Sequence, residues 1–342
     1  MAIEIIATGR AVPANRVTND DLATRIDTSD EWIRSHTGIG SRHLADDDTA
    51  TSDLSYEASM RALEALVESG HAASIEEAAM SLDVIIIGTA TPDFNGFPST
   101  ACIVQDRLGA QRAGAVDVAA GCTGFVYAME TAAGILTMGK GRKRALVLGA
   151  EILSRITNWE DRGTCVLFGD GAGAVILEKT DAPSEGPGKR GLLRSILGAE
   201  GNGADHLKME RGGSRKPFKK GEVIDTPPHL EMNGRAVYNF AVRAVTDTIK
   251  QLLEEEGVGF EDLALIIPHQ ANARIVQAAA KRLGIPEEKF YLNIEEYANT
   301  SAASIPIALD EVVRAGKLKK GDLVLTVGFG AGLTYAGNLF VW

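Results

Sequence analysis

The chain has few cysteines, no long apolar run and no leader-like start, and each shortage excludes a class of protein. Its three cysteines, Cys102, Cys122 and Cys165, are too few and too scattered for a disulfide framework. We therefore expect a reducing, cytoplasmic setting, in which an unusual cysteine is more often catalytic than bridged. No apolar run approaches the roughly 18 residues of a membrane span. The opening "MAIEIIATGRAVP" has no basic segment before an apolar core, so no signal peptide is expected.

Positive charge and metal-ligand spacing are also scarce. The net charge of −11 argues against bulk electrostatic binding of nucleic acid, although it leaves room for a local basic patch. The six histidines and three cysteines show no spacing typical of a metal site, so no metal is expected. The whole chain is 45% hydrophobic and 24% charged, which is ordinary for a globular protein.

Short β-branched runs alternate with longer helical patterns, which predicts an α/β fold. Several of the runs are apolar on both faces, as strands of a covered central sheet are. The predicted strands are 3–9, 82–90, 115–121, 144–152, 165–170, 173–179, 192–201, 263–270, 290–297, 322–330 and 333–342. The predicted helices are 52–69, 99–108, 123–139, 233–256, 271–283 and 301–315.

An internal repeat predicts two halves. "IVQDRLG" (103–109) precedes a strand and Cys122, and "IVQAAAKRLG" (275–284) precedes a strand and Asn299. "VLFGDGAGAVILE" also resembles "TVGFGAGLTYAGNLF" as a strand, a glycine turn and a strand. The linker-like segment 181–191 divides the chain into 1–180, with the cysteine, and 191–342, with His269 and Asn299. We expect a pseudo-twofold axis that places Cys122 and Asn299 at equivalent positions, meeting in the middle. The segment 201–229, rich in glycine, lysine and proline, is expected to be a long surface excursion.

Cys122 lies in "VDVAAGCTGFVYAME", where a strand ends and a helix begins. Backbone N–H groups at a helix start would point at its sulfur and stabilise the thiolate, which is the nucleophilic form. Gly121 and Gly124 allow a tight turn and close backbone approach. The alternative is a buried structural thiol, the interpretation we give to Cys102, within a helix, and Cys165, within a strand.

His269 and Asn299 are the other candidates. His269 follows a predicted strand, and ligand sites in open α/β sheets gather at the carboxyl ends of strands. A neutral imidazole there could donate a hydrogen bond or act as a base for a thiol; the alternative is a surface or capping histidine. Asn299 could simply cap a helix, but the repeat places it opposite Cys122.

Two glycine clusters, 169–174 and 328–332, could suggest nucleotide binding. A dinucleotide loop needs a helix after it, whereas strand-like residues follow both clusters. Tight hairpins are therefore predicted. Backbone N–H groups of the second could still face a substrate oxyanion.

Taken together, Cys122, "PHQAN", "ANTSAAS" and "GFGAGLTY", in that order, resemble the β-ketoacyl-acyl-carrier-protein synthase III family of the thiolase-like superfamily. "TSDEWI" (28–33), "FPSTAC" (97–102) and "DRGTCVLFGDGAGA" (161–174) fit the same family, so the resemblance spans the chain. It implies a duplicated α/β/α/β/α fold and a homodimer. It implies no cofactor, because the CoA thioester is a substrate.

The resemblance also implies a reaction, the initiating condensation of fatty acid synthesis. An acyl-CoA primer, often acetyl-CoA, would acylate Cys122. His269 and Asn299 would then hold the malonyl thioester of malonyl-acyl-carrier protein while CO₂ leaves and the enolate attacks. The N–H groups of Cys122 and Ala331 match the family's oxyanion hole. A Cys–His–Asn set separates this branch from relatives with two histidines or a second cysteine.

Binding residues follow from the same resemblance. Trp32 and Arg162 match positions that sandwich the adenine of CoA, and indole–guanidinium stacking is a sound way to hold a flat base. Thr28 and Asn272 match ligand-contacting positions. Phe97 matches a residue that reaches across a dimer to close the partner's acyl pocket.

Docking of an acidic carrier protein needs local positive charge. Arg274 matches a docking position, and Arg235, Arg243 and Lys250 fall on one face of the helix predicted at 233–256. An ordinary solvated face is the alternative. The chain departs from relatives at His36 and Asn239, where basic residues are common.

Two further functions share these motifs. One is an acyltransferase or ketide synthase of a secondary-metabolite pathway, which would differ in pocket lining and partner. The other is a non-catalytic subunit, against which the intact Cys122, His269 and Asn299 argue. Primer length and branching depend on pocket packing, which the sequence leaves open.

Overall fold

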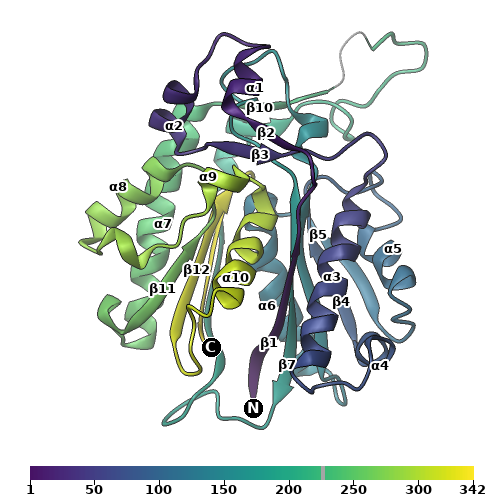
Figure 1. Cartoon of the computed structure of the whole chain (residues 1–342), viewed down its shortest axis with the longest axis vertical. Helices are drawn as coiled ribbons and strands as arrows, with labels where there is room; N and C mark the ends of the chain where they lie inside the picture. Colours follow the sequence, from purple (N-terminus) through teal and green to yellow (C-terminus); the bar gives the residue numbers. More distant parts are fainter. Residues whose placement is uncertain (225–227) are drawn as a thin grey trace.

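The computed structural model describes residues 1–224 and 228–342, and its elements form five alternating layers of helix and sheet (Figure 1). One outer layer holds α3 (Thr51–Glu68), α4 (Ile75–Met80) and α5 (Thr100–Arg107), and the other holds α7 (Gly234–Glu256) and α8 (Ala273–Leu283). The middle layer holds α6 (Gly124–Met138) and α10 (Ser304–Arg314). The predicted α/β/α/β/α arrangement is therefore present.

The two sheets have the same strand order, which is the clearest sign of duplication. The first runs β1-β7-β6-β4-β5, from β1 (Ala2–Ala11), β7 (Gly171–Thr180), β6 (Arg144–Glu151), β4 (Val84–Gly88) and β5 (Gly114–Val118). The second runs β8-β13-β12-β11, from β8 (Gly191–Ala199), β13 (Thr334–Val341), β12 (Leu323–Gly330) and β11 (Leu263–Pro268). The parallel pair β4–β6 of the first sheet corresponds to the parallel pair β11–β12 of the second. The antiparallel pair β6–β7 corresponds in the same way to β12–β13.

The fifth strand of the second sheet is reduced to one bridge, between Ile266 and Phe290. The prediction of a strand over 290–297 is therefore wrong beyond Phe290, because the residues after it form α9 (Ile294–Tyr297). Each sheet draws its strands from one side of the 181–191 segment. We keep the division into 1–180 and 191–342 as a proposal that this strand content supports.

The middle helices are apolar because each lies between two sheets. Phe125 and Met129 of α6 and Ile305 and Leu309 of α10 belong to one buried cluster that also includes strand residues of both sheets. Strands β4 and β6 are buried along their whole lengths, as expected of strands covered on both faces. This packing fixes where α6 and α10 begin, and both begin at the candidate site.

The segment 152–170 and Cys102 correct predictions made from the sequence. The segment contains no regular strand at 165–170, so the first glycine cluster is not a hairpin and Cys165 lies in a buried turn. Phe168 instead forms an isolated parallel bridge with Asn299. Cys102 does lie in α5, but it is exposed rather than part of the core.

Small elements gather at one end of the layers, the top of Figure 1. They are α1 (Asn19–Ala23), α2 (Asp30–Thr37), β2 (Arg16–Thr18), β3 (Ser41–His43), β9 (Leu207–Met209) and β10 (Leu230–Met232). The predicted excursion at 201–229 contains β9, and its residues 225–227 lie outside the described part of the chain. No helix in that described part combines the length and apolar character needed to cross a bilayer.

Candidate active site

Cys122 lies in a 3₁₀ turn, Gly121–Thr123, between β5 and α6. Gly121 has φ +51°, and a Cβ there would lie 3.0 Å from the Ala331 Cβ. A Cβ on Gly124 would lie 3.1 Å from the Cα of Gly88. Both glycines are therefore needed for close approach, as predicted.

The Ser301 hydroxyl and the backbone N–H groups of Ala331 and of Cys122 itself act to lower the pKa of the Cys122 thiol. Even so, burial raises the pKa of Cys122 to about 11, and the nearby Glu151 charge adds to the rise. The expectation of a stabilised thiolate is therefore wrong for the resting protein, because desolvation outweighs the backbone donors.

The Ala331 N–H is held in place by the β12–β13 hairpin, which confirms the hairpin predicted for the second glycine cluster. A Cβ on Gly330 would lie 2.7 Å from the Cys122 Cβ, so a glycine is required beside the thiol. The Thr334 hydroxyl lies within hydrogen-bond distance of the carbonyls of Ala331 and Ala120, at 2.9 and 3.2 Å, and ties the hairpin to the cysteine turn.

The second half supplies a matching turn, Ser301–Ala303, directly before α10. Its first residue, Ser301, has φ +48°, as Gly121 has +51° in the cysteine turn. Aligning the two turns places Ala302 opposite Cys122, with Asn299 before the turn. The predicted equivalence of Cys122 and Asn299 is therefore wrong in register. The turns do meet in the middle layer, where a Cβ on Gly124 would lie 3.2 Å from the Ala302 Cβ.

Asn299 is buried, and its backbone is fixed by bonds to the loop before β7. Its N–H donates to Leu167 O at 2.9 Å, and its carbonyl accepts from Gly169 N at 3.0 Å. Its Oδ1 accepts from Ser301 N at 2.8 Å, which leaves the Nδ2 amide group as a donor. The residue before it, Ala298, has φ +56° and ψ −156°, a region that only glycine adopts readily.

His269 follows β11, as predicted, and is 1% exposed. Burial lowers its pKa to about 3, so the ring is neutral at physiological pH. Its Nδ1 lies 2.7 Å from the Ser304 hydroxyl, which also accepts from Gln270 N at 3.3 Å. Since the Ser304 hydroxyl already accepts one hydrogen bond, we infer that it donates its own proton to His269 Nδ1. The ring proton of the neutral imidazole then lies on Nε2, so Nε2–H is the donor of the ring.

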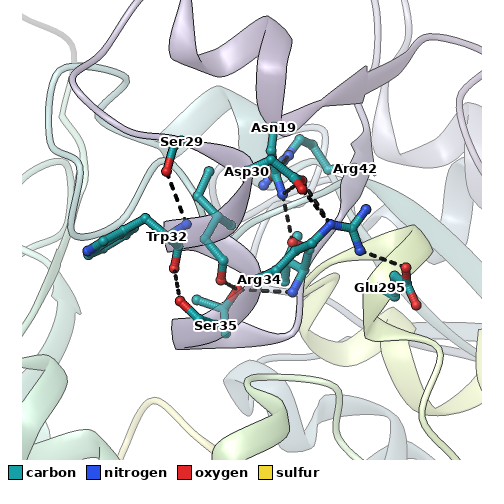
Figure 2. A network of polar contacts seen from close by, with 11 residues as sticks. Asn19, Ser29, Asp30, Trp32, Arg34, Ser35, Arg42 and Glu295 are labelled. Atoms are coloured by element: carbon teal, nitrogen blue, oxygen red, sulfur yellow. Dashed lines mark hydrogen bonds and ion pairs between the residues drawn. The ribbon is translucent and has the colours of Figure 1, made fainter.

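The residues around Asn299 are tied to the small elements at the top of the fold. Figure 2 shows Asp30, at the start of α2, between Asn19 and Arg34, with Arg34 reaching across to Glu295 of α9. The Arg34–Glu295 distance is 2.7 Å, and Gly40 N donates to the Glu295 carbonyl at 2.9 Å. These contacts fix the chain just before Ala298 and Asn299.

The opposite side of α2 carries the predicted adenine site. Trp32 points away from the polar network in Figure 2. The Arg162 guanidinium carbon lies 4.6 Å from the Trp32 ring centroid, and His36 stacks on the same residue at 4.4 Å. A hollow of about 510 Å³ beside them is lined by Arg25, Ile26, Asp27, Trp159, Glu160 and Arg162.

Thr28 and Asn272 have different surroundings. The Thr28 hydroxyl is buried without a hydrogen-bond partner among the described residues, so a ligand group there would satisfy it. Asn272 caps α8 through its Oδ1, which accepts from Arg274 N, and its Nδ2 donates to His36 O at 3.0 Å. Both ends of the Asn272 amide therefore already join α8 to α2.

Phe97 is 88% exposed, in the segment between β4 and α5. Arg274, Arg235 and Arg243 are all exposed, at the start of α8 and along α7. Arg243, however, is paired with Glu200 at 2.7 Å. The predicted basic face of α7 is therefore partly neutralised.

Sequence reasoning missed three polar residues of the site, namely Glu151, Ser301 and Ser304. Glu151 is fully buried at the end of β6 and accepts a hydrogen bond from Ser301 at 3.0 Å. A carboxylate ending an otherwise apolar strand was the available signal. The two serines stand inside "NTSAAS", where they pass for helix-start residues.

Comparison with known proteins gives one consistent result. Residues 116–201 match the family model of 3-oxoacyl-[acyl-carrier-protein] synthase III, and residues 253–342 match the model of its C-terminal part. A β-ketoacyl-[acyl-carrier-protein] synthase III from Caldanaerobacter subterraneus subsp. tengcongensis is 47% identical, over 100% of this chain and 98% of that protein.

Solved structures agree. The 3-oxoacyl-[acyl-carrier-protein] synthase III of Aquifex aeolicus superposes with a TM-score of 0.87 at 41% identity, covering 100% of both chains. The priming β-ketosynthase of the R1128 polyketide pathway gives 0.87 at 33% identity, covering 99% of this chain and 96% of its own. The chain therefore belongs to the β-ketoacyl-acyl-carrier-protein synthase III family, whose members are acyl-transferring condensing enzymes of thiolase-like fold.

Proposed function

We propose that this condensing enzyme transfers an acyl group from acyl-CoA to Cys122 and then condenses it with malonyl-acyl-carrier protein. The products are 3-oxoacyl-acyl-carrier protein, CO₂ and CoA, and acetyl-CoA is the expected primer. The meeting of the two turns carries the proposal, because it brings the Cys122 turn against the Ala331 hairpin and against the turn that follows Asn299 and leads into Ser304. The reaction as proposed uses only side chains and backbone of this chain.

In acyl transfer, Cys122 Sγ attacks the thioester carbonyl and the carbonyl oxygen gains negative charge. The N–H groups of Cys122 and Ala331, which meet at the thiol, are suited to receive that oxygen. A donor placed where charge develops typically lowers the barrier by about 3 kcal/mol. Collapse of the tetrahedral intermediate breaks the carbon–sulfur bond to CoA and leaves the acyl group on Sγ.

In condensation, His269 and Asn299 donate to the carbonyl oxygen of the malonyl thioester. Loss of CO₂ leaves an enolate, whose oxygen these donors stabilise and whose carbon attacks the acyl group on Cys122. The very low pKa of His269 supports this role, because a ring that stays neutral keeps one N–H to donate. The Ser304 hydroxyl supports it further by occupying Nδ1. The bond to Sγ then breaks and frees the thiol.

CoA recognition is proposed at Thr28, Trp32, Arg162 and Asn272. The unpartnered Thr28 hydroxyl and the Trp32–Arg162 stack support it. Asn272 would contact a ligand only if its present bonds changed, so we assign it chiefly to holding α8 against α2. For the acyl-carrier protein, Arg274 and Arg235 supply exposed positive charge.

A homodimer is proposed from the exposed edge of the first sheet. Strand β5 ends the sheet, its Val116 is 43% exposed, and the nearby Phe97 is 88% exposed. An exposed apolar edge strand is normally covered by a partner. Phe97 would then reach the partner's acyl pocket. A cytoplasmic location belongs to the same proposal, because the Cys122 thiol must stay reduced to accept an acyl group.

A second candidate is a priming ketosynthase of a secondary-metabolite pathway, favoured by the similarity to the R1128 enzyme. The deciding experiment combines purified malonyl-acyl-carrier protein with a panel of acyl-CoAs and follows CO₂ release and product mass. Condensation with acetyl-CoA and a fatty-acid carrier protein supports the first function. If malonyl-carrier protein is never consumed while another acyl acceptor is, the first function is wrong.

A further inference from the structure

Serine is an unexpected residue at position 301. Ser301 has φ +48°, a left-handed conformation that strains any residue with a Cβ. The equivalent position of the cysteine turn is Gly121, with φ +51°, and glycine adopts this conformation without strain. A serine in the second turn therefore needs a side-chain contact that offsets the strain of its backbone.

Glu151 supplies that contact. The Ser301 hydroxyl donates to Glu151 Oε1 at 3.0 Å, and the two residues are 3% and 0% exposed. Because neither side chain can turn to water instead, loss of one leaves the other without its partner. The carboxylate is held from the first half of the chain by Thr91 Oγ1 at 2.6 Å, Ala90 N at 3.1 Å and Thr89 Oγ1 at 3.3 Å.

The end of β6 is shaped to receive the second turn. Gly149 and Glu151 are two residues apart on this strand, so they face the same side of the sheet. A Cβ on Gly149 would overlap the carbonyl of Ala302, the residue after Ser301. The glycine therefore lets the turn press against the strand, where the Glu151 carboxylate reaches the Ser301 hydroxyl.

Ser301 also determines how the Asn299 side chain is turned. Its backbone N–H donates to Asn299 Oδ1 at 2.8 Å. The oxygen and nitrogen ends of a carboxamide have nearly the same shape, so hydrogen bonding decides which end faces a substrate. The two non-glycine residues of positive φ in the described part of the chain, Ala298 and Ser301, stand on either side of this segment.

We propose that Glu151 is a positioning residue for Asn299 and acts through Ser301. By holding the Ser301 hydroxyl, Glu151 keeps the residue at φ +48° and its N–H on Asn299 Oδ1, so that Nδ2 is the end offered to the malonyl thioester. Without this contact, Ser301 can relax and the amide can turn over. Oδ1 would then face the enolate oxygen and repel it. The inference rests on the proposed function, in which Asn299 stabilises that enolate.

The test separates condensation from acylation on the full chain. Acetyl-enzyme is freed of acetyl-CoA and mixed with malonyl-acyl-carrier protein, and the product is followed by mass in a single turnover. Glu151→Ala should slow this step by about tenfold or more, toward the roughly 100-fold loss that follows removal of a whole donor. Acyl-enzyme formation from acetyl-CoA should stay within about threefold. Glu151→Gln retains an oxygen that accepts from Ser301, so it should recover most of the lost condensation rate.

A double-variant cycle tests the route through Asn299. Ser301→Ala keeps the Cβ and the backbone N–H but removes the hydroxyl, and alone it should slow condensation by about tenfold. In an Asn299→Ala background no amide remains to be positioned. Adding Ser301→Ala or Glu151→Ala there should slow condensation by less than about twofold further, since residues that act through one group are not additive.

Asp117→Ala is the matched control. It removes another buried carboxylate, one that accepts from the N–H groups of Thr100 and Ala101 at 2.7 and 2.8 Å and does not contact Ser301. This variant should unfold at a lower urea concentration, as Glu151→Ala should. Its ratio of condensation to acylation should nevertheless stay within about twofold of the unchanged protein.

Three results would overturn the positioning role. Glu151→Ala could slow acylation and condensation equally, which would make Glu151 a structural residue only. Glu151→Gln could be as slow as Glu151→Ala. The effects could multiply in the Asn299→Ala background, which would place Ser301 elsewhere in the reaction. If Glu151→Ala does not fold, the Ser301→Ala cycle decides alone. Failure of the unchanged protein to form or condense acetyl-Cys122 would instead overturn the proposed function itself.

Discussion

The guanidinium carbon of Arg162 lies 4.6 Å from the centroid of the Trp32 ring, so the two side chains are already stacked on each other. A flat base can enter between them only if they separate. In the proposed CoA site, binding would therefore separate the two side chains and replace one stacking contact with two.

Replacing Arg162 by glutamine should raise KM for acyl-CoA about tenfold and leave kcat nearly unchanged, since stacking on a cation contributes roughly 1–2 kcal/mol. Steady-state kinetics at saturating malonyl-carrier protein measures both values. Arg25→Gln is the matched control, because Arg25 lines the same hollow. Equal effects of the two variants would mean that only charge matters.

Ala298 is a strained residue, and the strain can be measured. Ala298→Gly and Ala303→Gly both remove a fully buried methyl group and both make the unfolded chain more flexible. They differ in backbone, because Ala298 has φ +56° and Ala303 has φ −74°. Ala298→Gly should therefore be more stable than Ala303→Gly by about 1–3 kcal/mol in urea unfolding. Equal stabilities would show that Ala298 is not strained.

His269 should make the folded protein less stable in acid, most visibly below about pH 4.5, where the opposing contribution of Glu151 no longer changes. The pKa of His269 falls from 6.5 to about 3 on folding. Between these two pH values, His269 therefore binds a proton in the unfolded chain but not in the folded chain. Stability is full above about pH 6.5 and falls toward pH 3 by up to about 1.4 kcal/mol per pH unit. His269→Gln should flatten this dependence in urea unfolding at a series of pH values.

Glu151 gives the opposite sign and serves as the control. Burial raises its pKa from 4.5 to about 7, so its contribution is full below about pH 4.5 and is lost as the pH rises to about 7. Glu151→Gln should remove this loss of stability between about pH 4.5 and 7. The fall in stability with acid that His269 causes should then be steeper in the same pH range. An unchanged pH dependence in both variants would contradict the burial of these groups.

Ser304 fixes the tautomer of His269, so its loss should affect condensation alone. Ser304→Ala leaves Nδ1 free to carry the proton, and Nε2 then has none to donate. Malonyl decarboxylation should slow by about tenfold or more, toward the roughly 100-fold loss that follows removal of a whole donor. Acyl-enzyme formation from acetyl-CoA should stay within about twofold. Equal losses in both steps would place Ser304 elsewhere in the reaction.

Much of the fold could be predicted from local pattern, because buried strands and middle-layer helices have apolar residues on both faces. The repeat between 103–109 and 275–284 indicated the duplication that the sheet orders confirm. Predictions failed where tertiary contacts override pattern. The residues after Phe290 alternate like a strand, yet they form α9, which is held by Arg34 through Glu295.

The site shows the same limit. Cys122 was visible because it interrupts a pattern, but its raised pKa comes from burial between two turns that are far apart in sequence. Glu151 accepts a hydrogen bond from Ser301, which belongs to the other half of the chain. Spacing along one strand or helix carries no information about such contacts.

The most direct test of the central claim is the mass of the protein after brief exposure to acetyl-CoA. We predict one added acetyl group, located on Cys122 by peptide mapping and absent in Cys122→Ser. Cys102→Ser and Cys165→Ser should acquire the acetyl group normally, although Cys102 is the more exposed thiol. Acetyl on Cys102 or Cys165, or its persistence in Cys122→Ser, would contradict the assignment of Cys122 as the acyl acceptor.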